Sequence, residues 1–188
     1  MGLEIDFSEF AAARVREAVR DLMEHAPPAL VPAASRLEAD AHAVGRDDAS
    51  AARFQSLLEI GYLVASADGF ADEERTALAA LLESVLGEAF THDELDLHFR
   101  DLADGVEMLG RRERMRRAAD DFDDGLSRSE ALGFATLVAV ADGVVAAPEA
   151  RALEELGAFL GLGSDEVTQA VTRVTSELAR RLRSGGAA

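Results

Sequence analysis

The amino-acid sequence predicts an all-α protein, a helical bundle of about seven to eight helices, and three observations support this fold class. Apolar residues recur at steps of three and four along most of the chain, which is the period of an amphipathic helix. No segment shows the alternating β-branched pattern of a strand, so no strand is expected. Hydrophobic residues make up 48% of the 188 residues, which is enough to bury a core between helices.

The N-terminal part of the chain should form one clear helix followed by a break. The residues spaced to line one face of this helix are Phe7, Phe10, Val15, Ala18 and Leu22. The Pro-rich segment 26–32 ends the helix, because proline lacks a backbone N–H and fixes its φ angle. A weaker helix is predicted over 33–44. The chain then divides into an N-terminal helical extension with a Pro-rich linker over 1–48, a helical domain over 49–183 and a disordered tail over 184–188.

The helical domain should begin with a hairpin of two helices. The first starts at Asp48 or Ser50, both favourable N-cap residues, and ends at Gly69. Its apolar face consists of Phe54, Leu57, Leu58, Gly61, Tyr62 and Ala65. The second helix runs from Asp72 to Gly87 and presents leucines at helical spacing.

Further helices are predicted in the rest of the domain. Thr91 and Ser127 each open a helix with the spacing of a capping box, in which a Glu follows three residues later. The helix after Ser127 is apolar nearly all round, which predicts burial at the centre of the bundle. Pro148 suits the first turn of the next helix, and Ser164 is expected to cap the last one.

A short phrase occurs twice in the chain and indicates an internal duplication. Ala67-Asp68-Gly69 is followed by Glu73 and Glu74, and Ala141-Asp142-Gly143 is followed by Glu149. In each copy an apolar helix stops at the Ala-Asp-Gly phrase, and an amphipathic helix opened by acids follows a short loop. Two related helical hairpins that cannot bury their apolar faces alone should pack together with pseudo-twofold symmetry.

These two Asp-Gly loops are the candidate functional site, and two interpretations of them are open. A hard divalent cation, Ca²⁺ or Mg²⁺, would need both loops to meet, because one loop supplies too few oxygens. Alternatively the loops are only turns and caps, since Asp-Gly favours a turn and acids suit the positive end of a helix. The positive end of the helix also repels a cation, which favours the second interpretation. The candidate ligands are Asp68, Glu74, Asp142 and Glu149, with Asp72 and Glu73 nearby.

The composition excludes several functional classes. The net charge of −17 opposes binding to nucleic acid, whose phosphates are also negative. The absence of cysteine excludes disulfides, thiol catalysis and Cys-ligated zinc. No lysine is present for a phosphate-binding P-loop and nothing points to a nucleophile, so no enzymatic activity is expected. The sequence contains neither a signal peptide nor an apolar run near the ~18 residues of a membrane span, which predicts a cytoplasmic protein without membrane insertion.

Two charged segments resemble binding motifs but have simpler explanations. The Arg-rich stretch 111–117 could meet anionic lipid, phosphate or an acidic partner. However, Glu113 precedes Arg117 by four residues, as Arg116 precedes Asp120, which favours pairing within an exposed helix. The acidic run 120–125 lacks the ligands that an EF-hand loop needs at its third and twelfth positions, so a solvated acidic turn is expected.

The duplicated phrase resembles the signature of the TerB-like family, the tellurite-resistance protein B group. The resemblance also includes the stretch 160–166, Leu-Gly-Leu-Gly-Ser-Asp-Glu, and it covers roughly residues 50–180. It implies an all-helical domain with two related halves and acidic residues that bind divalent metal. It also implies a non-enzymatic role in the bacterial cytoplasm, in stress or tellurite response, with a membrane-associated protein partner. After Gly143 this chain has apolar residues over 144–147, so the second loop is poorer in ligands than the first.

Overall fold

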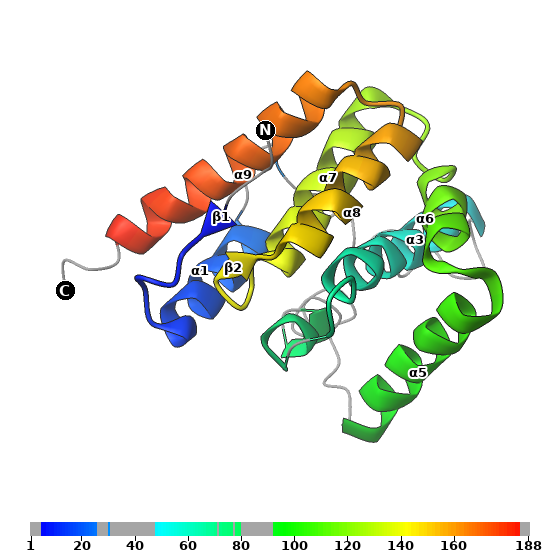
Figure 1. The fold of residues 1–188 in the computed structure, drawn as a ribbon, viewed down its shortest axis with the longest axis horizontal. Coiled ribbons are helices and arrows are strands. Elements are labelled where there is room, and N and C mark those ends of the chain that lie inside the picture. Colours follow the sequence, from blue (N-terminus) through cyan, green and yellow to red (C-terminus); the bar gives the residue numbers. More distant parts are fainter. Residues whose placement is uncertain are drawn as a thin grey trace.

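The computed structural model of the chain describes residues 5–25, 30, 48–70, 72–76, 78–79 and 92–184. This part of the chain is almost entirely helical, which confirms the all-α prediction (Figure 1). The helices are α1 (Ala12–Glu24), α3 (Asp48–Ala65), α5 (His92–Leu109), α6 (Arg111–Ala119), α7 (Gly125–Ala139), α8 (Ala147–Phe159) and α9 (Ser164–Ser184). Residues 72–76 and 78–79 are also helical. Among the described helices, none has both the length and the apolar character needed to cross a bilayer.

Several predictions lie outside the described residues. They concern the Pro-rich linker, the weak helix over 33–44, the end of the second helix at Gly87, the capping box at Thr91 and the tail beyond residue 184. The starts of α3 and α8 agree with the sequence, since α3 begins at Asp48 and Pro148 lies in the first turn of α8, whereas α3 ends at Ala65 and not at Gly69 as predicted.

Helix α7 is the centre of the bundle, as its all-round apolar sequence predicts. It packs against α3, α9, α8 and α1, and every residue from 130 to 141 is buried (Figure 1). The predicted apolar face of α3 is buried, although Tyr62 packs against the rings of Phe70 and Phe99. The two helices approach closely at Gly61, where a Cβ atom would lie 2.8 Å from Cε1 of Phe134.

The start of α7 differs from the prediction. Its N-cap is Asp124 and not Ser127, because the Asp124 carboxylate accepts hydrogen bonds from the amides of Leu126 at 2.8 Å and Ser127 at 2.9 Å. Ser127 lies inside the first turn and donates its hydroxyl to the Asp124 carbonyl at 3.0 Å. Both residues are good caps, and the spacing of a capping box did not show which of them ends the preceding turn.

The expectation that the chain contains no strand is wrong at one place. Strand β1 (Ile5–Asp6) pairs antiparallel with β2 (Val144–Val145), Ile5 opposite Val145 and Asp6 opposite Val144. The amide of Phe7 extends the pair by donating to the Gly143 carbonyl at 2.6 Å. Strands of two residues are too short to show an alternating pattern. As a result Phe7 and Phe10 precede α1 instead of lining its face as predicted.

Helix α1 is built into the same core as the rest of the bundle. It packs on α9 and α7 and buries Val15, Ala18, Val19, Leu22 and Met23. Polar contacts support this packing, since Arg14 donates to the Leu182 carbonyl and Arg181 of α9 pairs with Asp21. The N-terminal helix therefore has a fixed position relative to α9.

The contact between α8 and α9 leaves no room for a side chain at Gly157. A Cβ atom there would overlap with Cγ2 of Val167. We expect Gly157→Ala to lower the free energy of unfolding by about 1–3 kcal/mol, because overpacking forces the two helices apart. Gly125→Ala is the control, since its Cβ would have no atom within 4 Å. Urea denaturation measures the free energy of unfolding of both variants. Equal values for the two variants would contradict the close packing of α8 on α9 at Gly157.

Candidate functional site

The two Asp-Gly loops, at positions 68 and 142, come together in the structure. The pKa of Asp142 is raised, first by partial burial and then by the negative charges of Glu73 and Asp68 from the other loop. The pKa of Glu149 is also raised by burial, and the charges of Asp68 and Asp142 add to that effect. Charges from both loops therefore act on the same groups, so the two loops lie near each other.

The helices that lead into the two loops end in the same way. Before the first loop, the Ser66 amide donates to the Tyr62 carbonyl and the Ala67 amide to the Val64 carbonyl. Before the second loop, the Val140 amide donates to the Thr136 carbonyl and the Ala141 amide to the Val138 carbonyl, at the equivalent positions. Gly69 and Gly143 follow with φ angles of 134° and 106°, a conformation that L side chains rarely adopt. The Ala-Asp-Gly phrase therefore encodes the same helix end twice, as the duplication predicted.

Glu74 and Glu149 form the buried part of the site. Each residue is only 2% exposed, and their side chains are hydrogen-bonded to each other. Burial raises the pKa of Glu149 to about 7, although the hydrogen bond from Glu74 opposes this rise. Oε2 of Glu149 accepts from the Ala146 amide at 2.8 Å, whereas Oε1 is buried and has no N–H donor in the described part of the chain. A hydrogen bond between two carboxyl groups needs a proton on one of them, and the raised pKa of Glu149 favours that protonated form.

The other predicted site residues lie around this pair. Oδ1 of Asp142 accepts from the Val144 amide at 2.9 Å and so closes its own turn. Glu73 forms an ion pair with Arg16 of α1. The structure thus brings together Asp68, Glu73, Glu74, Asp142 and Glu149, while Asp72 is exposed at the start of the following helix. Among the described residues, no three acid or histidine side chains are already placed to hold a metal ion.

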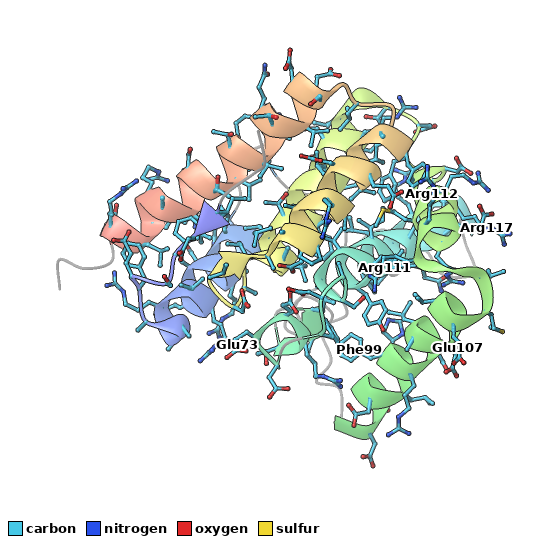
Figure 2. The ribbon with its side chains drawn as sticks, in the orientation of Figure 1. Glu73, Phe99, Glu107, Arg111, Arg112 and Arg117 are labelled. Atoms are coloured by element: carbon cyan, nitrogen blue, oxygen red, sulfur yellow. The ribbon has the colours of Figure 1, made fainter. Side chains whose placement is uncertain are left out.

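Arg111 fixes the end of α3 just before the first loop, a role that the sequence analysis missed (Figure 2). Its Nη1 donates to the Leu63 carbonyl and to Oγ of Ser66, and its Nη2 donates to the Ser66 carbonyl at 2.6 Å. A guanidinium at this place satisfies carbonyls that the helix leaves without partners, and it complements the negative end of the helix dipole. Burial lowers the pKa of Arg111, yet arginine stays protonated in proteins. Arg114 of the same run also faces α3, where it pairs with Glu59, but Arg111 is the one that binds carbonyls at the end of that helix.

The outer arginines of α6 agree with the exposed-helix interpretation. Glu113 pairs with Arg116 at 3.0 Å and with Arg117 at 2.7 Å, and Arg116 also pairs with Asp120 at 3.0 Å. Hydrogen bonds from Arg116 and then Arg117 hold the pKa of Glu113 at about 2. These side chains neutralise one another, as the four-residue spacing predicted.

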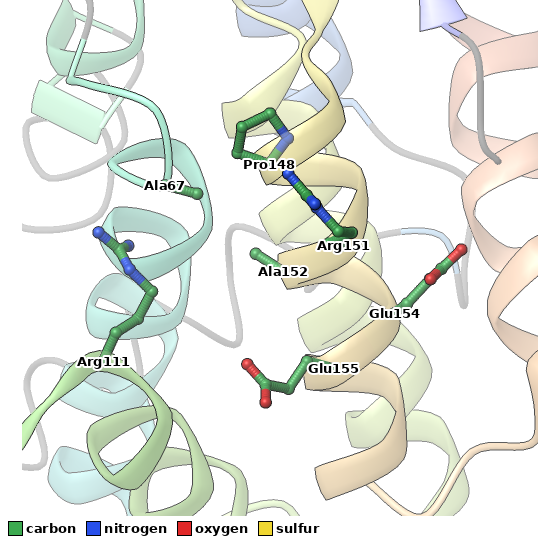
Figure 3. Close-up of a pocket in the computed structure, with 7 residues that line it drawn as sticks. All are labelled: Ala67, Arg111, Pro148, Arg151, Ala152, Glu154 and Glu155. Atoms are coloured by element: carbon green, nitrogen blue, oxygen red, sulfur yellow. The ribbon is translucent and has the colours of Figure 1, made fainter.

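An open groove of about 620 Å³ lies beside the loops, between α8 on one side and α3 with α6 on the other (Figure 3). Its lining consists of Ala67, Arg111, Pro148, Arg151, Ala152, Glu154 and Glu155. The groove adjoins the loops, but its lining includes none of the five clustered carboxyl groups. Several of its charged groups already have partners, since Arg111 binds the end of α3, Arg151 donates to the Ala147 carbonyl, and Glu155 pairs with Arg112.

The geometry of the loops defines what the site can do chemically. Acidic side chains from the two duplicated loops influence one another electrostatically, and two of them, Glu74 and Glu149, are buried as a pair. Such a pair can take up and release a proton. Comparisons of the chain with protein-family profiles, with curated proteins and with solved structures gave no match.

Proposed function

We propose that this chain is a non-enzymatic, TerB-like helical module that binds a divalent cation, Ca²⁺ or Mg²⁺, between its two acidic loops. In this proposal it works in the bacterial cytoplasm, in tellurite or stress response, through a membrane-associated protein partner. The two helical-hairpin halves that carry the loops are related by pseudo-twofold symmetry. The observation that carries the proposal is the buried pair of Glu74 and Glu149, one from each half, hydrogen-bonded to each other.

The buried pair suits a cation because two ionised carboxylates cannot stay together away from water without compensation. A shared proton is one form of compensation. A hard divalent cation, which prefers several carboxylate and carbonyl oxygens, is the other. Glu74 and Glu149 would hold the ion from the inside, and Asp68 and Asp142 from the rim. Such an ion supplies positive charge that links the two loops in place of the proton.

Binding at this site should be weak. Asp142 and Glu149 each already accept a backbone hydrogen bond, so a cation has to draw the carboxylates closer and complete its shell with carbonyl or water oxygens. The apolar residues after Gly143 offer no additional carboxylate. We therefore expect a dissociation constant on the order of 10⁻⁴ M, far above that of a preorganised calcium site.

The test is the melting temperature in chelator and then with about 10 mM Ca²⁺ or Mg²⁺. A hundredfold excess over Kd raises the free energy of unfolding by about 2.7 kcal/mol if only the folded state binds. For a chain of this size the melting temperature should rise by roughly 5–10 °C. Asp68→Asn should remove most of this rise, because it deletes a ligand charge while keeping the shape of the side chain.

Asp123→Asn is the matched control. Asp123 is an exposed acid before the start of α7, whereas the second loop follows the other end of that helix. Removing the Asp123 charge should leave the cation-induced rise in melting temperature unchanged. Equal shifts in the wild type and both variants would show general screening of the −17 net charge, and no shift in the wild type would overturn the proposal.

The alternative is a protein-interaction scaffold without a metal site, in which the loops are only helix turns and caps. The hydrogen bonds that Asp142 and Glu149 accept from nearby amides favour this alternative. An exposed apolar groove beside the N-terminal helix would strengthen it, but the described groove along α1 is mostly charged. Its lining is Arg14, Glu17, Ala18, Asp21, Arg181 and Leu182. A protein that responds to neither cation would leave the scaffold as the better explanation.

A further inference from the structure

The N-terminal segment contacts both acidic loops. Strand β1 pairs with β2 directly after Gly143, and the Phe7 amide donates to the Gly143 carbonyl. At the other loop, Arg16 of α1 forms an ion pair with Glu73, with Nη1 and Oε1 3.3 Å apart. Residues 5–24 therefore form part of the surroundings of the candidate site.

The position of Arg16 is fixed by the packing of α1. Its neighbour Val15 is fully buried, and Val19, one turn further along, is 1% exposed. Arg14, on another side of the helix, donates to a carbonyl near the end of α9. Since α1 is anchored on α9 by these contacts, it presents the Arg16 guanidinium to the helix that follows the first loop.

The charge of Glu73 reaches the second loop, because it is among the groups that raise the pKa of Asp142. Arg16 sets a positive charge against this carboxylate. We propose that Arg16 is a charge-balancing residue of the cation site, which keeps Glu73 out of the ligand set and lowers the affinity of the loops for a divalent cation. The physical reason is Coulomb repulsion between the guanidinium and the ion at short range. This inference rests on the proposed function, since it presupposes cation binding at these loops.

Calorimetric titration of the chelator-treated protein with Ca²⁺, and separately with Mg²⁺, at low ionic strength tests the inference. We expect Arg16→Gln to bind roughly three- to tenfold more tightly than the wild type, because a nearby positive charge is gone. Arg16→Lys keeps the charge and should bind like the wild type. Arg20→Gln removes the same charge one turn further along α1 and should change the affinity by less than about twofold.

A double-substitution cycle separates the role of Glu73 from that of the overall charge. In the wild-type background Glu73→Gln should weaken binding only slightly, because Arg16 holds this carboxylate outside the ligand set and the partly exposed guanidinium left behind is screened by solvent. In the Arg16→Gln background the same substitution should remove most of the gain. Effects of Glu73→Gln that are equal in the two backgrounds would contradict the proposed pairing.

The titration distinguishes the failure of this inference from the failure of the proposed function. A wild type that binds a cation, with Arg16→Gln no tighter than Arg20→Gln, overturns the inference alone. Weaker binding by Arg16→Gln would make Arg16 a structural anchor and would also overturn it. A wild type that binds neither cation overturns both proposals. Melting curves without cation check that each variant folds, which is expected because the ion pair lies at the surface.

Discussion

The free energy of unfolding of the chelator-treated protein should fall between about pH 5 and 8, and Glu149→Gln should abolish most of this fall. The pKa of Glu149 is raised from its ordinary 4.5 to about 7 by burial, so the folded state holds a proton that the unfolded chain releases. This contribution to stability is therefore complete below about pH 4.5 and is lost as the pH rises through 7. The rise of this pKa from 4.5 to about 7 corresponds to a loss of on the order of 3 kcal/mol in the free energy of unfolding.

Comparison with the variant is essential, because other groups also titrate in this range. Burial lowers the pKa of His98, so the contribution of His98 to the free energy of unfolding rises with pH and opposes the fall caused by Glu149. The pKa values of Glu113 and Glu177 are lowered, so these two groups change the free energy of unfolding only below about pH 4.5, outside the range of pH 5 to 8. Urea denaturation at several pH values gives the difference between wild type and variant. If this difference does not change with pH, Glu149 does not hold the proton.

Glu149→Gln should also separate stability from cation binding. A glutamine amide can accept from Ala146 and donate to Glu74, so it imitates the protonated carboxyl. The variant should be more stable than the wild type at about pH 8 in chelator, yet it should not be stabilised by Ca²⁺ or Mg²⁺. A variant that gains stability from the cation as the wild type does would remove Glu149 from the ligand set.

Arg111→Ala should lower the free energy of unfolding by about 2–4 kcal/mol. The substitution deletes three charge-assisted hydrogen bonds and leaves the carbonyls of Leu63 and Ser66, at the end of α3, without this donor. It also removes a positive charge from the negative end of the helix. Because these carbonyls belong to the last turn before Asp68, the first loop should loosen and the cation-induced rise in melting temperature should shrink.

Two further variants give this prediction its controls. Arg117→Ala, on the same helix, removes an exposed pair with Glu113 and should cost less than about 1 kcal/mol. Arg111→Lys keeps the charge but loses the planar fork, so its stability should fall between those of the wild type and Arg111→Ala. Urea denaturation measures all three. Equal losses for Arg111→Ala and Arg117→Ala would show that the cap at the end of α3 is not a stabilising feature.

The sequence predicted best where one local signal dominates. The all-round apolar run of α7 correctly placed that helix in the centre, and Pro148 correctly marked the first turn of α8. Prediction was weaker where two local signals compete, as with Asp124 and Ser127 at the start of α7. It failed for β1 and β2, because strands of two residues show no periodicity and their pairing joins segments that are far apart in the chain.

By itself, the sequence determined the helical fold, the two Ala-Asp-Gly helix ends and the acids that follow them. These features depend on helical periodicity and on glycine conformation, which act over a few neighbouring residues. Only the tertiary structure decided that Glu74 and Glu149 are buried against each other, that Arg111 turns toward α3 and that Arg16 reaches Glu73. Each of these contacts joins residues far apart in the chain. Burial, which sets the pKa of Glu149, depends on how the helices pack and not on the residues next to it.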